Sequence, residues 1–234
     1  IKNFSKIFKS ISAIRFMNVS QCYVLFLSIL RNYKKLGTDP LRTFNIIEKF
    51  TFNYSAVCKM PGNKVERIYS RYATLIEEII LTETDKKIPG KVQSILSSLE
   101  KELKNERPGI EYFSDQFMDV KYKLSSNGIS FIKYVLSEIN NVKEKTDEYK
   151  LDFNNVNIEH LLPQKPDPEW NLKRADIKDY VNLIGNLTLL SKKLNSKIGN
   201  GTIPNKIDEL TNSKIPITEE VVSNLIRDKF IWNE

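Results

Sequence analysis

The chain has 234 residues, of which 41% are hydrophobic and 28% charged, and its formal net charge is +7 at pH 7. This composition is typical of a folded protein with a substantial core and argues against a disordered chain. No apolar run approaches the ~20 residues that a membrane-spanning helix needs, and no segment has the pattern of a signal peptide. We therefore expect a cytoplasmic protein without membrane contact, and the basic balance favours a polyanionic partner such as DNA.

We expect a mostly helical domain over residues 1–150, because apolar residues recur there at spacings of three and four. This segment has 25 basic and 17 acidic residues, a net charge of +8, whereas residues 151–234 have a net charge of −1. A charged stretch, Lys143–Lys150, is expected to be a linker. The predicted helices are Phe4–Phe16, Ser20–Leu36, a helix that begins at Asp39-Pro40, Lys64–Thr82, a helix over Val92–Lys104 after a break at Pro89-Gly90, and Ile129–Val142.

The pattern changes after residue 150. Two short β-prone segments, Asn157–Leu162 and Leu187–Leu190, are separated by a long loop rich in Pro, Asp and Lys. Ser191 is a typical cap for a short helix over Lys192–Ile198, which glycines follow. The order strand, loop, strand, helix predicts a small second domain over residues 151–234 and an α+β fold for the chain.

The candidate functional residues of this second segment are a histidine and two asparagines. His160 is the only histidine of the chain, and it lies in Ile158–Gln164, whose sequence is Ile-Glu-His-Leu-Leu-Pro-Gln. Asn186 follows in Ile184–Leu190, whose sequence is Ile-Gly-Asn-Leu-Thr-Leu-Leu. Asn195 lies further along, inside the predicted basic helix.

These motifs resemble the HNH, or ββα-metal, endonucleases. More narrowly, they are similar to the C-terminal nuclease domains of GmrSD-like and SspE-like modification-dependent restriction and phage-defence proteins, the latter including phosphorothioate-sensing members. The resemblance covers about residues 157–206. It implies a divalent-metal-dependent DNA endonuclease that cleaves or nicks foreign DNA, as the effector part of a larger protein. The nucleotide-dependent N-terminal domain of that larger protein would then be a partner absent from this sequence.

The resemblance also assigns roles. His160 would be the general base that activates water, a task suited to an imidazole that titrates near neutrality. Asn186 would orient the ring or the loop, and Glu159 and Asn195 would be oxygen ligands to Mg²⁺ or Mn²⁺. Because neighbouring strand residues point to opposite faces, Glu159 and His160 can share one site only if the strand ends or bulges there.

Four lysines are candidate DNA contacts. They are Lys192, Lys193, Lys197 and Lys206. Two alternative functions stay open on the sequence alone, a catalytically silent DNA-binding module and a purely helical interaction domain. Metal-dependent nicking of plasmid would separate the enzyme from both.

Overall fold

The computed structural model describes residues 3–143 and 153–229, and the chain divides into two compact units, Ile1–Phe117 and Met118–Glu234. The described residues are mostly helical and contain one two-stranded antiparallel sheet, so the expected α+β class is confirmed at this level. Most of the predicted linker, residues 144–150, lies outside the described residues. No helix in the described ranges is long and apolar enough to cross a bilayer.

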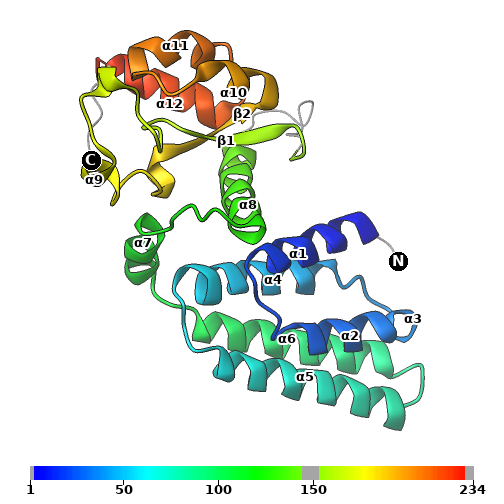
Figure 1. Ribbon diagram of the computed structural model, residues 1–234. Helices are drawn as coiled ribbons and strands as arrows, with labels where there is room; N and C mark the ends of the chain where they lie inside the picture. The colour runs from blue at the N-terminus through cyan, green and yellow to red at the C-terminus, as the bar shows by residue number, and fades with distance from the viewer. Residues whose placement is uncertain (1–2, 144–152, 230–234) are drawn as a thin grey trace. The chain divides into compact units, whose positions relative to one another are not determined.

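The first unit is a bundle of helices (Figure 1). Its core consists of aliphatic and aromatic side chains. Phe26 and Phe44 stack at its centre, with ring centroids 4.1 Å apart. The elements are α1 (Phe4–Phe16), α2 (Tyr23–Arg31), α3 (Tyr33–Leu36), α4 (Leu41–Thr51), the π-helical η1 (Phe52–Val57), α5 (Gly62–Thr82), α6 (Ile88–Glu106) and α7 (Ile110–Met118).

The predicted helices of this unit are found with two differences. The segment Ser20–Leu36 is interrupted at Asn32, whose side chain donates to the Ser28 carbonyl and to Glu77. Pro89 does not break α6 but lies in its first turn, where a residue without an N–H costs no helical hydrogen bond. The helix therefore begins before the predicted break.

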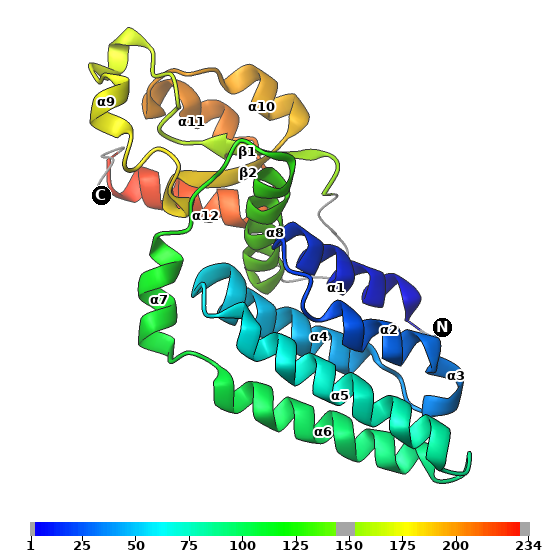
Figure 2. The same ribbon diagram turned by 60° about the horizontal axis from the view of Figure 1, so that its bottom comes forward.

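The second unit is built on the paired strands β1 (Val156–His160) and β2 (Leu187–Ser191). Helices α8 (Ser126–Lys143) and α10 (Lys192–Ile198) pack against both strands, and α12 (Pro216–Arg227) packs against β2 and α8 (Figures 1 and 2). The remaining elements are η2 (Pro168–Trp170), α9 (Arg174–Ile177), η3 (Ile184–Asn186) and α11 (Ile203–Thr211).

The boundary between the compact units, after Phe117, differs from the boundary expected after residue 150. The difference arises from α8, whose contacts are with β1, β2 and α12 of the second unit. An amphipathic pattern predicts that a helix has a buried face, but it does not reveal which core that face joins.

Candidate active site

Strand β1 ends at His160 and brings two of the predicted site residues to its last positions. The pairing with β2 runs without a bulge from Val156 opposite Ser191 to His160 opposite Leu187. Glu159 and His160 therefore project to opposite faces of the two-stranded sheet. The strand stops there because Pro163, which has no N–H to donate, follows two buried leucines. The sequence predicted that Glu159 and His160 could share one site only if the strand ended or bulged there. The strand ends at His160, and its pairing with β2 contains no bulge.

The His160 imidazole is largely enclosed. The Tyr122 ring meets it edge to face, with centroids 4.9 Å apart and planes at 85°. Burial lowers the pKa of His160 below its usual value of 6.5, a hydrogen bond with the Asn182 side chain works against this shift, and the Lys206 charge adds to it. The net effect favours the neutral imidazole near pH 7, which is the form that can accept a proton.

On the other face, Glu159 forms a buried ion pair with Lys206 of α11. The ammonium nitrogen lies 2.7 Å from Oε1 of Glu159, and the Lys206 side chain has no exposed surface. The same nitrogen donates to the carbonyl oxygens of His160 (2.8 Å) and Leu161 (3.1 Å). Burial raises the pKa of Glu159, and the adjacent ammonium opposes that shift.

Asn186 is buried and holds the chain segment that follows β1. Its amide oxygen accepts from the Leu162 N–H, and its amide nitrogen donates to the carbonyls of Leu162 and Val181, each at 2.8 Å. Its main-chain carbonyl also accepts from the Leu161 N–H at 3.0 Å. The Asn186 side chain thus holds the loop after His160, and none of these hydrogen bonds involves the His160 imidazole.

Helix α10 brings Asn195 to the strands. The hydroxyl of Ser191 caps the helix by accepting from the Leu194 N–H at 3.3 Å, as its sequence predicted. Ile198, with Leu194 beside it, joins a core cluster that includes Leu161 of the segment after β1. Asn195 lies between these two apolar residues in sequence and is half-buried.

Three buried polar atoms at the end of β1 and on α10 and α11 have no hydrogen-bond partner among the described residues: Nε2 of His160, Oδ1 of Asn195 and Oε2 of Glu209. An imidazole nitrogen and an amide oxygen are groups that hold water, a cation or a substrate atom. No three His, Cys, Asp or Glu side chains come together anywhere in residues 3–143 and 153–229. The buried carboxylate of Glu159 and the amide of Asn195 are oxygen donors of the kind that Mg²⁺ or Mn²⁺ prefers, and an ion held by them would also need substrate oxygens.

The four candidate DNA contacts separate into two kinds. Lys192, Lys193 and Lys197 are exposed on α10, and Lys197 lies 3.9 Å from Glu209. Lys206 is different, because it is fully buried and bonded to three protein oxygens. Its assignment as a DNA contact is corrected accordingly, since a buried ammonium with three acceptors has no donor left for a phosphate.

Tyr122 and Asn182 were not identified from the sequence. Both reach His160 because the segment around Lys121 forms a β-bridge to Leu183, and the Tyr122 N–H donates to the Asn182 carbonyl at 2.7 Å. Neither residue lies in a motif or at a periodic position, so their long-range pairing had no local signal in the sequence.

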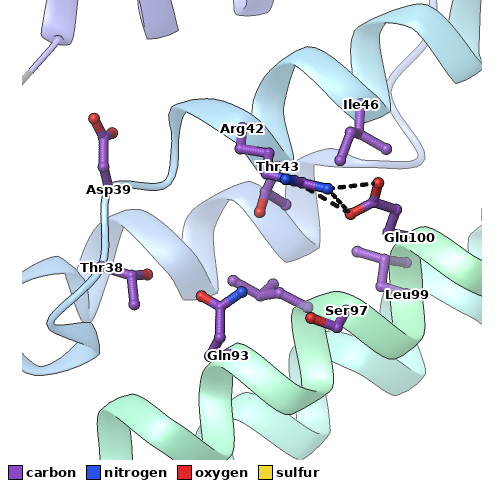
Figure 3. A pocket seen from close by; sticks show the side chains of 10 residues that line it. Thr38, Asp39, Arg42, Thr43, Ile46, Gln93, Ser97, Leu99 and Glu100 are labelled. Carbon is purple, nitrogen blue, oxygen red and sulfur yellow. Dashed lines mark hydrogen bonds and ion pairs between the residues drawn. The ribbon is translucent and has the colours of Figure 1, made fainter.

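The helical unit contains a separate pocket between α4 and α6, of about 180 Å³. Arg42 and Glu100 face each other across it and form a two-pronged ion pair, with its closest contacts at 2.9 Å (Figure 3). Arg42 and Glu100 thus satisfy each other, while Asp39, which also lines the pocket, accepts from the Leu41 N–H at 3.0 Å.

Residues 107–234 match the family model of the C-terminal domain of GmrSD restriction endonucleases. No curated protein matches the chain.

Proposed function

Since this match covers more than half of the chain, the protein belongs to the family of GmrSD restriction endonuclease C-terminal domains, and we propose that it is an HNH-type, divalent-metal-dependent DNA endonuclease. The observation that carries the proposal is the position of His160. Its neutral imidazole ends β1, and its Nε2 has no hydrogen-bond partner among the described residues. The order β1, β2, α10, with α10 packed on both strands, supports a ββα arrangement around it.

In this mechanism His160 is the general base. Its Nε2 accepts a proton from the attacking water, and the lowered pKa keeps this nitrogen free to do so near neutral pH. Tyr122 restricts the rotation of the imidazole through the edge-to-face contact. Asn186 holds the Leu162 peptide in place, so that the strand end carrying His160 does not shift.

Asn195 and Glu159 would hold the divalent ion, with phosphate oxygens completing the coordination. When bound, Mg²⁺ or Mn²⁺ would stabilise charge on the phosphate and on the leaving 3′ oxygen. Glu159 and His160 lie on opposite faces of the sheet. A site that uses both side chains would therefore be at the end of β1, because only there can a ligand reach both faces.

DNA would be bound by exposed cations. Lys192, Lys193 and Lys197 of α10 would contact phosphates beside the site. The unit Ile1–Phe117 has 19 basic and 12 acidic residues, a net charge of +7, and Met118–Glu234 has 17 of each. The helical unit would therefore add most of the non-specific attraction. In keeping with the family, the nuclease would act in restriction of foreign DNA, together with a nucleotide-dependent domain.

A plasmid-nicking assay tests this proposal. Supercoiled plasmid incubated with the protein and Mg²⁺ or Mn²⁺ should convert to nicked or linear DNA, and EDTA should stop the conversion. A protein that binds the plasmid but leaves it supercoiled with either ion would instead be a catalytically silent DNA-binding module.

A further inference from the structure

Lys206 is the most deeply buried cation of the proposed site. Its side chain has no exposed surface, and its three N–H groups match three oxygens at 2.7, 2.8 and 3.1 Å. Two of these oxygens belong to the peptides of His160 and Leu161, and the third belongs to the Glu159 carboxylate. The side chain of Lys206 is thus a fixed part of the interior.

This ion pair determines the net charge of the protein groups at the proposed metal site in the absence of a bound ion. Glu159 contributes one negative charge, which Lys206 offsets at 2.7 Å, the amide of Asn195 contributes none, and Glu209 of α11 is offset by Lys197 at 3.9 Å. A site of zero net charge holds a divalent cation weakly, and the lysines of α10 add a further positive field. The negative charge that a tightly bound ion needs must then come from the DNA phosphate.

We propose that Lys206 is a positioning residue of the metal site, which holds and neutralises Glu159 and so makes tight binding of the divalent ion depend on DNA. This inference rests on the proposed function, because it takes Glu159 and Asn195 as ligands. Its consequence is a nuclease that carries little metal in the absence of substrate and completes its site on the DNA backbone.

The test measures Mn²⁺ affinity rather than cleavage. Mn²⁺ binding would be measured by calorimetry or electron paramagnetic resonance at pH 8, with and without a short duplex, in a His160→Ala background that leaves the duplex uncut. The variants are Lys206→Met, which keeps an unbranched side chain without its charge, and the neutral pair Glu159→Gln/Lys206→Met. Folding would be checked by circular dichroism and thermal melting.

We expect the reference protein to bind Mn²⁺ weakly alone and much more tightly with duplex. Lys206→Met should bind Mn²⁺ at least ~10-fold more tightly than the reference without DNA, because a full carboxylate charge then faces the ion. The neutral pair should lose this gain. Equal or weaker Mn²⁺ binding by folded Lys206→Met would overturn the inference.

Lys206→Met can also fail to fold alone, because removing one partner of a buried ion pair leaves an uncompensated charge. In that case Mn²⁺ should restore its folded spectrum and raise its melting temperature, while the neutral pair folds without Mn²⁺. Failure of Mn²⁺ to restore Lys206→Met, beside a folded neutral pair, would contradict the inference. If the reference protein binds no Mn²⁺ even with duplex, the metal site of the proposed function fails and the inference fails with it.

Discussion

Asn186 binds both polar groups of the Leu162 main chain, accepting from its N–H and donating to its carbonyl at 2.8 Å each. A third bond, to the Val181 carbonyl, uses its remaining donor. One buried amide side chain therefore satisfies both polar main-chain groups of Leu162 in the loop that follows His160. Asn195 differs, since its buried Oδ1 has no protein partner in the described chain. The two asparagines should consequently respond differently to substitution.

Asn186→Ala should destabilise the second unit. Three main-chain groups lose their partner in a buried region, and each unsatisfied group costs on the order of 1–3 kcal/mol, so a loss of ~3 kcal/mol or more is expected. Denaturant unfolding of the variant would measure this loss. Cleavage should fall as well, and excess Mn²⁺ should not restore it, because the amide positions the loop and holds no ion.

Asn195→Ala should leave stability within ~0.5 kcal/mol of the wild type, since its amide oxygen has no hydrogen bond to lose. Cleavage with Mg²⁺ should fall sharply and should recover in part at high Mn²⁺, which demands less ideal coordination than Mg²⁺. Metal titrations of cleavage would compare the two variants. Identical titration curves for Asn186→Ala and Asn195→Ala would argue against separate roles.

His160 should protonate below its usual pKa of 6.5 in the metal-free protein, because burial disfavours the imidazolium. As the pH falls, the unfolded chain therefore takes up this proton at a higher pH than the folded protein does. The contribution of His160 to the free energy of unfolding is complete above pH 6.5 and is lost as the pH falls through the lower pKa of the folded state. As this is the only histidine, its ring signals in an NMR titration are unambiguous. Tyr122→Ala should move the pKa back toward 6.5 by admitting water; an unshifted pKa in the wild type would contradict the proposed enclosure.

DNA binding should depend more on the helical unit than on α10. Replacing Lys192, Lys193 and Lys197 together by Gln should reduce the slope of log K against log salt by at most about 2.7, or ~0.9 for each phosphate contact. Most of the affinity of the full chain for duplex DNA should remain, because the net charge of +7 lies in Ile1–Phe117. If the triple variant instead loses nearly all of its salt dependence, the charge of the helical unit is only a solvated surface.

The bounds of several helices and of both strands were predicted well from local sequence patterns. The predicted helices Phe4–Phe16 and Lys192–Ile198 have the same bounds as α1 and α10. Apolar spacing and the residues at the helix ends are local signals, so they predict such bounds without knowledge of distant contacts. The two strands were placed within two residues of their ends. The membership of α8 was not predictable in this way, because it depends on contacts with strands that are distant in sequence.

The site was predictable to the same extent. The family match supports the resemblance from which the site residues were inferred, while their roles stay predictions. The burial of Lys206 was not visible, because a lysine in a polar segment has the sequence signature of a surface residue. Its role depends on Glu159, which is 47 residues away in the chain.

The most direct test of the central claim is plasmid cleavage by His160→Ala with added imidazole. The folded variant should bind duplex DNA as the wild type does and should cleave ~10²–10⁴-fold more slowly, as expected for loss of a general base. Free imidazole entering the space left by the side chain should restore part of the rate, with a dependence on imidazole concentration that wild type lacks. Cleavage by purified His160→Ala at the wild-type rate, without imidazole, would show that His160 is not the base of this nuclease.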